Sequence, residues 1–231
     1  MIPFTTWLQD LSGIFYPKLC PGCFETFAAT EHPVCSFCIN RLPYTNFATL
    51  SDNPTEHMFV GRLQLEAAHS VFYFSKGHTI QRMMHQLKYN NQPIMGEWMG
   101  VLLGNELKLS GRFNSIDHII ALPMEKSKER KRGYNQASVI ANGVAKEMKV
   151  PVLEQAIIKS KKTSSQTRKD RQQRWMNIHD SFVVMQEEPL KNKNILLIDD
   201  VITTGATIDA CGNQLLRAGV GKLFVASIAI A

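Results

Sequence analysis

The residues most able to do chemistry in this chain lie between positions 195 and 207. Four apolar residues predict a buried strand, and two carboxylates, Asp199 and Asp200, follow where that strand is expected to end. A threonine-rich loop then leads into a helical pattern. Backbone amides at the start of a helix can bind an anion, and hydroxyl groups add further donors. We therefore expect a phosphate site at Thr203, Thr204, Gly205, Ala206 and Thr207.

The acidic pair restricts what that phosphate can belong to. Two carboxylates so close to the loop would repel a polyphosphate, whereas they could accept hydrogen bonds from sugar hydroxyls. The combination fits a ribose 5-phosphate group. The sequence contains neither a Walker-type glycine-lysine loop nor a Gly-x-Gly-x-x-Gly pattern, so other nucleotide loops are disfavoured. A plain strand–helix junction with an Asp-rich end is the alternative interpretation.

The segments around this loop predict the fold. Apolar runs at 71–74, 116–122 and 223–230 are typical of buried strands, and helical patterns lie between them. Strands that alternate with helices imply a mainly parallel sheet flanked by helices. We therefore predict an α/β domain over residues 69–231, in which the acidic pair and the loop lie at the carboxyl ends of the strands.

Four of the five cysteines form two CxxC pairs separated by eleven residues near the start of the chain. This spacing predicts one tetrahedral zinc site whose four ligands are Cys20, Cys23, Cys35 and Cys38. Four thiolates leave no open coordination position, so the zinc is expected to be structural. A redox CxxC or two unrelated thiol pairs are the alternatives. We assign residues 1–45 to this zinc-binding domain and the turn-rich residues 46–68 to a linker.

The positive charge of the chain is concentrated in two segments. The net charge is +6, and residues 159–174 carry all of that excess. Their mixture of basic and small polar residues suits a loop that closes over a substrate, with Arg168 and Arg171 as anion-binding candidates. The second segment follows a predicted strand and could face a pyrophosphate with Lys126, Lys128, Arg130, Lys131 and Arg132. Solvated surface is the alternative for either segment.

Composition and the N-terminal sequence indicate the class of protein. The chain has 231 residues, of which 44% are hydrophobic and 20% charged, as in ordinary globular proteins. No apolar run approaches the length of a membrane span, and the first residues lack the basic start of a secretory signal. We therefore expect a cytoplasmic protein, in which thiols stay reduced and can bind metal.

Several motifs resemble those of known proteins. Residues 195–207 resemble the 5-phosphoribosyl 1-pyrophosphate (PRPP) signature of type I phosphoribosyltransferases. Nearly end to end, the chain is similar to the ComF family (ComFC/GntX-like proteins). The motifs that carry this resemblance are the cysteine pairs, Leu87-Lys88-Tyr89, Arg132-Gly-Tyr-Asn-Gln136 and the segment Gln166 to Phe182. The chain departs from the family at Ala121-Leu-Pro-Met124, where Pro-Val-Pro-Leu is frequent.

The resemblance implies a function. It implies transfer of a phosphoribosyl group from PRPP, bound with Mg²⁺, to an unknown acceptor with release of pyrophosphate. Asp199 and Asp200 would then hold the ribose hydroxyls and temper positive charge at the anomeric carbon. The family is associated with DNA uptake in natural competence, which implies single-stranded DNA and DNA-uptake proteins as partners. The competing hypothesis is a non-catalytic accessory protein that senses PRPP or binds single-stranded DNA.

Overall fold

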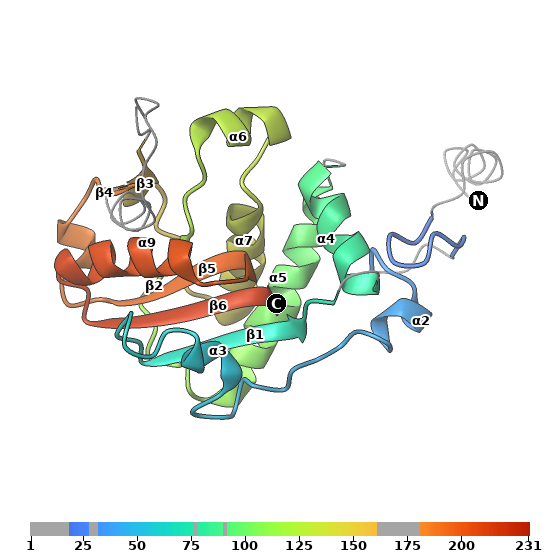
Figure 1. Cartoon of the computed structure of the whole chain (residues 1–231), viewed down its shortest axis with the longest axis horizontal. Coiled ribbons are helices and arrows are strands. Elements are labelled where there is room, and N and C mark those ends of the chain that lie inside the picture. Colours follow the sequence, from blue (N-terminus) through green and yellow to red (C-terminus); the bar gives the residue numbers. More distant parts are fainter. Residues whose placement is uncertain (1–18, 28–31, 76–77, 90–91, 161–180) are drawn as a thin grey trace, which may run out of the picture.

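A four-stranded sheet lies at the centre of the part of the chain that the structure describes (Figure 1). This computed structural model describes residues 19–27, 32–75, 78–89, 92–160 and 181–231. Every strand pairing in the sheet is parallel, and the strand order is β1-β6-β5-β2. The four strands are β1 (Ala67–Tyr73), β2 (His118–Ala121), β5 (Asn194–Ile202) and β6 (Lys222–Ile230). The predicted α/β class with a parallel sheet is confirmed.

Helices cover both faces of this sheet (Figure 1). They are α4 (Thr79–Tyr89), α5 (Pro93–Ser110), α7 (Gln136–Met148) and α9 (Ala206–Arg217). Successive residues of β5 point to opposite faces, so Leu196 and Ile198 pack with α4, α5 and α7. Ile195 and Leu197 pack on the other face, with α9. Two apolar cores therefore hold β5 in place, and β5 carries the acidic pair.

Helices α5 and α7 touch through their backbones. A β-carbon added to Gly100 would overlap the carbonyl oxygen of Ile140 and would lie 3.0 Å from the Cα of Gly143. A β-carbon on Gly143 would in turn overlap the carbonyl oxygen of Glu97. This glycine contact fixes α7 against α5, and the first residues of α7 border the acidic pair.

Residues 46–68 are packed against the sheet, although their turn-rich sequence predicts a linker. Helix α3 (Pro54–His57) begins at Asn53, whose side chain accepts hydrogen bonds from the amides of Thr55 and Glu56. Phe59 and Leu63 are buried in the core that contains α9. A few apolar anchors separated by turn formers are therefore enough to dock this segment on the core, and the linker limits 46–68 remain a prediction.

The N-terminal residues also pack on the main core. Short helix α2 (Ser36–Ile39) contains Cys38, which is buried in the same cluster as residues of α4 and α5. The amide of Thr45 donates to the carbonyl of Val71 over 2.9 Å. The amide of Tyr73 donates to the carbonyl of Pro43, also over 2.9 Å. The cysteine-containing unit is therefore attached to β1. The domain limits 1–45 and 69–231 remain predictions.

Three smaller elements complete the description. Strands β3 (Ile157–Lys159) and β4 (Phe182–Val184) pair antiparallel, and a 3₁₀ helix, η1 (Glu188–Leu190), follows them. Helix α6 (Lys126–Arg132) follows β2, where the sequence indicates only a charged segment. Arg168 and Arg171 lie outside the described residues. Within the described ranges, no helix combines the length and apolar character that a membrane crossing requires.

Candidate functional site

The predicted phosphate loop lies at the carboxyl end of β5. The strand runs through both carboxylates to Ile202, so it is longer than the sequence suggests, and α9 starts at Ala206. Gly205 precedes α9 with a φ of 74°, a left-handed conformation that favours glycine. A β-carbon there would also lie 2.9 Å from the ring of Phe59. Thr203 and Thr204 are exposed, so the loop is open to a ligand.

A cavity of about 260 Å³ reaches the end of this loop at Thr207, whereas Thr203, Thr204, Gly205 and Ala206 do not line it. Charged residues from β5, α4, α6 and β3 line it: Asp199, Asp200, Lys88, Glu125, Lys128, Arg132 and Lys159. Thr207, residues 122–124 and the start of α7 complete the lining. The structure thus brings Arg132 and Thr207 next to the acidic pair. Arg130 is exposed and does not line this cavity.

The two carboxylates have different surroundings. Burial, followed by the neighbouring charge of Asp200, raises the pKa of Asp199 to about 7. Asp200 instead forms an ion pair with Lys88, whose Nζ lies 2.7 Å from its Oδ2. The amide of Asp200 donates to Oδ1 of Asp199 over 2.7 Å. One carboxyl group of the pair therefore titrates near neutral pH beside a second that has a cation as partner.

Lysines from different elements line the cavity beside the acidic pair. Lys159, on β3, is partly buried, and this burial lowers its pKa, with a further lowering by Lys128 and an opposing effect of Asp199. Lys88 comes from the end of α4. The cavity therefore offers lysines from separate elements to anionic groups bound near the carboxylates.

The Arg132–Gln136 motif has a visible structural role. Asn135 caps α7 by accepting from the amide of Ala137 over 3.2 Å, and its Nδ2 donates to the carbonyl of Leu122 over 3.0 Å. The hydroxyl of Tyr134 donates to the carbonyl of Leu87, next to Lys88. The motif therefore connects β2, α7 and the end of α4 around the cavity.

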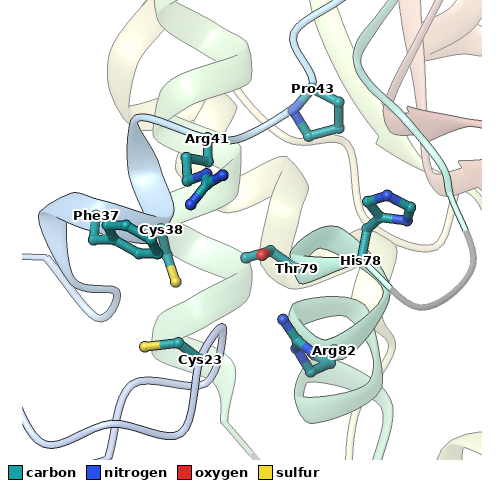
Figure 2. Close-up of a pocket in the computed structure, with 8 residues that line it drawn as sticks. All are labelled: Cys23, Phe37, Cys38, Arg41, Pro43, His78, Thr79 and Arg82. Carbon is teal, nitrogen blue, oxygen red and sulfur yellow. The ribbon is translucent and has the colours of Figure 1, made fainter.

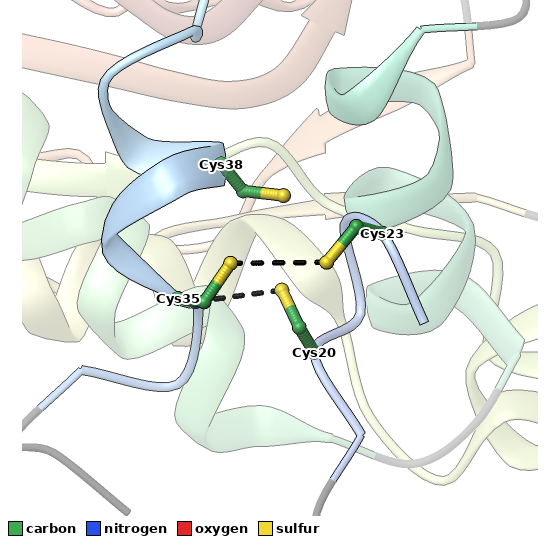
Figure 3. A group of neighbouring side chains, drawn as sticks. All are labelled: Cys20, Cys23, Cys35 and Cys38. Atoms are coloured by element: carbon green, nitrogen blue, oxygen red, sulfur yellow. Dashed lines mark hydrogen bonds between the residues drawn. The ribbon is translucent and has the colours of Figure 1, made fainter. Parts of the chain in front are cut away.

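The four predicted metal ligands come together in the structure. The sulfur atoms of Cys20, Cys23, Cys35 and Cys38 all lie within 4.8 Å of one another, and Figure 3 shows them converging. Although burial raises the pKa of Cys20, hydrogen bonds from the amides of Cys35, Cys23 and Gly22 lower it to about 7. Burial raises the pKa of the Cys35 and Cys38 thiols. The convergence of four sulfur atoms is what suits metal binding, so the cluster could hold a metal ion.

A second cavity, of about 320 Å³, adjoins the cysteine cluster. Figure 2 shows Arg41 and Arg82 beside Cys23 and Cys38, with the first residues of α4 completing the wall. Two guanidinium groups at this place would offset the negative charge of four thiolates around a divalent ion. The surroundings of the cluster therefore fit a metal–thiolate centre.

Two residues near the site could not be identified from local sequence patterns. Lys88 stands in a family-like motif, but its contact with Asp200 bridges 112 positions of the chain and has no local signal. Arg62 lies in the expected linker, and its Nη1 donates to the carbonyl oxygen of Thr204 over 3.1 Å. Only the assembled sheet brings these two cations to the acidic pair and the loop.

Comparison with known proteins agrees with this arrangement. Residues 135–230 match the family model of the phosphoribosyl transferase domain. "DNA utilization protein YhgH" of Escherichia coli O157:H7 is 25% identical over 146 residues, which are 62% of this chain and 63% of that protein. "Competence protein F" of Haemophilus influenzae is 28% identical over 162 residues, which are 66% of this chain and 70% of that protein. "Competence protein ComFC" of Bacillus subtilis is 28% identical over 101 residues, 44% of this chain and 39% of that protein.

Two solved structures align with part of this chain at low TM-scores. Glutamine PRPP amidotransferase from B. subtilis has a TM-score of 0.44 at 16% identity, over 62% of this chain and 30% of that one. Adenine phosphoribosyltransferase from Leishmania tarentolae has a TM-score of 0.36 at 13% identity, over 78% of this chain and 89% of that one. The family match and the relatives confirm the resemblance found in the motifs: residues 135–230 match a phosphoribosyl transferase domain, and the chain is similar to proteins named for DNA utilization and competence, including ComFC.

Proposed function

We propose that the protein binds PRPP in the cavity over Asp199 and Asp200 and transfers its phosphoribosyl group to an acceptor. The observation that carries this proposal is the joining, in one cavity, of two carboxylates with the end of a phosphate loop and cations from three further elements. A phosphate, a sugar and a pyrophosphate require these three kinds of partner, and PRPP contains all three groups.

Each part of the cavity has a role in this proposal. The 5-phosphate would lie on the amides and hydroxyls of Thr203 to Thr207, at the start of α9. The ribose hydroxyls would donate to Asp199 and Asp200. Lys128 and Arg132 would bind the pyrophosphate, and Arg168 and Arg171 are further candidates for the same group.

Departure of pyrophosphate leaves positive charge on the anomeric carbon, as in other glycosyl transfers. Carboxylates held beside the ribose would stabilise that charge, and the cations around the cavity would stabilise the negative charge of the leaving group. The oxygen donors of the acidic pair suit Mg²⁺, which supplies further positive charge to pyrophosphate when bound. The described cavity shows no side chain that identifies the acceptor.

The test of this function is isothermal calorimetry with PRPP and Mg²⁺, followed by an assay of pyrophosphate release with a panel of bases and amines. Release that depends on one acceptor would establish the transferase. Tight binding without release would favour the second candidate, a PRPP sensor. Absence of PRPP binding in the folded protein would contradict both.

Single-stranded DNA binding is a further candidate, supported by the names of the relatives, which refer to DNA utilization and competence. Under this hypothesis the protein would act with DNA-uptake proteins on the cytoplasmic side. Retention of single-stranded DNA that weakens steeply with salt would support it, because phosphate contacts release counterions.

We also propose that the cysteine cluster holds a structural zinc ion. Purified protein is expected to contain about one zinc per chain, since four thiolates complete a tetrahedral site. Cys35→Ser should lose the zinc and increase hydrogen exchange in the N-terminal unit, while the phosphoribosyltransferase domain stays folded. Zinc content is measured by plasma mass spectrometry.

Cys211→Ala is the matched control for this zinc prediction. Cys211 is buried on α9, away from the cluster, so its replacement should leave the zinc content unchanged. Wild-type protein that is free of metal and nevertheless protected from exchange around Cys35 would contradict the zinc assignment.

A further inference from the structure

The segment Phe59–Leu63, which precedes β1, contacts the phosphate loop. Arg62 donates through Nη1 to the carbonyl oxygen of Thr204 over 3.1 Å, and the same atom lies 3.0 Å from Oδ2 of Asp209. Its Nη2 donates to the carbonyl of Met58. The guanidinium group therefore connects its own segment, the loop and the first turn of α9.

We propose that Arg62 is a positioning residue that presents the phosphate loop to its ligand. This inference rests on the proposed binding of PRPP at that loop. The Thr204–Gly205 peptide is trans, so its carbonyl and its amide point in opposite directions. Arg62 holds the carbonyl on the protein side, and the amide of Gly205 must therefore face the opposite, open side.

Charge gives Arg62 a second role at the loop. Asp209 lies in the first turn of α9, and only 4% of its side chain is exposed. A carboxylate there stabilises the helix but would repel a phosphate bound at the same helix start. Arg62 balances this charge, and the partly buried pair therefore keeps the loop suited to an anion.

Packing fixes the segment that carries Arg62. A β-carbon added to Gly205 would lie 2.9 Å from the ring of Phe59. A β-carbon added to Gly212 would lie 2.8 Å from the side chain of Leu63. Asn213, on α9, donates through Nδ2 to the carbonyl of Arg62 over 3.3 Å. Residues Phe59–Leu63 thus pack against both the loop and α9, and we call this segment the brace.

The test compares Arg62→Met, Arg62→Met with Asp209→Asn, and the control Arg112→Met. Arg112 also pairs with a carboxylate, Glu56, over 2.7 Å, but it does not contact the loop. Loss of Arg62 should weaken PRPP binding about tenfold or more, as expected for a lost hydrogen bond to a charged group, and should lower the melting temperature. The control should lose stability and keep its affinity for PRPP.

The double variant separates positioning from simple stability. Arg62→Met alone removes the arginine that pairs with the buried Asp209 carboxylate. Asp209→Asn removes the charge of that carboxylate, so the double variant should regain stability. Its affinity for PRPP should recover only in part, because Asp209→Asn removes the repulsion of the phosphate but the Thr204 carbonyl is still not held. Full recovery of affinity together with stability would overturn the positioning role, as would wild-type affinity in Arg62→Met.

Hydrogen exchange of a peptide covering residues 203–207 tests the brace without PRPP. Exchange should be faster in both Arg62 variants than in the wild type, and unchanged in Arg112→Met. Equal exchange in all four proteins would overturn the inference. If the wild-type protein failed to bind PRPP, that result would contradict the proposed function, and the exchange measurement would still decide the role of Arg62.

Discussion

Replacing Asp199 and Asp200 together by asparagine is expected to weaken PRPP binding about 100-fold or more, with the fold and the metal content unchanged. Hydrogen bonds to charged groups contribute about 1.5–3 kcal/mol each, so the loss of two charged acceptors corresponds to at least this factor. The substitutions change charge and hardly any volume. Calorimetry with PRPP and Mg²⁺ measures the effect.

Glu188→Gln is the control for this experiment. It makes the same chemical change at an exposed carboxylate that pairs only with Lys191 among the contacts described for it. Its affinity for PRPP should equal that of the wild type. A double Asp variant that binds PRPP as tightly as the control would refute the assignment of the ribose hydroxyls to these carboxylates.

The single change Asp199→Asn should stabilise the unliganded protein at neutral pH. The pKa of Asp199 is raised from 3.8 to about 7, so between these values the folded state holds a proton that the unfolded state has released. Stability of the wild type therefore falls as pH rises through this window, and the loss is complete above it. The variant lacks this loss. The difference in unfolding free energy between Asp199→Asn and the wild type should therefore grow from about pH 4 to about pH 7.

Urea unfolding at several pH values measures this advantage. PRPP affinity of the wild type should rise over the upper part of the same window, as Asp199 becomes ionised and can bind Mg²⁺ and hydroxyl groups. A stability difference between Asp199→Asn and wild type that is independent of pH would show that Asp199 keeps an ordinary pKa.

Gly100→Ala is expected to destabilise the protein by about 3 kcal/mol, the upper end of the usual cost of overpacking. The new methyl group would overlap the carbonyl oxygen of Ile140, which is backbone and cannot rotate away. For a chain of this size the change should lower the melting temperature by about 6–12 °C. Because α7 borders the cavity, PRPP affinity should fall as well. Thermal unfolding followed by circular dichroism measures the first effect.

Gly111→Ala separates this steric effect from backbone strain. Gly111 has a φ of 73° and no atom within 4 Å of an added β-carbon, so only strain should act there, at a cost of about 1 kcal/mol. A melting temperature of Gly100→Ala equal to that of Gly111→Ala would contradict the close contact of α5 with α7.

Local patterns allowed part of the architecture to be predicted. The strands β5 and β6 are buried on both faces and therefore read as continuous apolar runs. The cysteine cluster follows from spacing alone, because two short turns bring four sulfur atoms together. In contrast, α6 has no buried residue, and its charged sequence lacks the apolar period that reveals a helix.

Two features of the site, the contact of Arg62 with the loop and the end of β5, depend on contacts between distant parts of the chain. Arg62 meets the carbonyl of Thr204 across 142 positions, and no periodicity near Arg62 indicates that partner. The end of β5 was expected at the acidic pair because carboxylates usually mark exposed turns. Pairing with β6 instead continues to Ile202, so the strand carries both carboxylates within its length.

The position of β6 between β1 and β5 has a consequence for the choice of expression fragments. A fragment limited to residues 135–230, the part that matches the family model, keeps β5 but lacks β1 and Arg62. One edge of β6 would then present unpaired backbone groups along a strand buried from Leu223 to Ile230. Long apolar edges of this kind promote aggregation between molecules. A fragment meant for ligand studies should therefore begin before α3, so that β1 and the brace remain attached to the sheet.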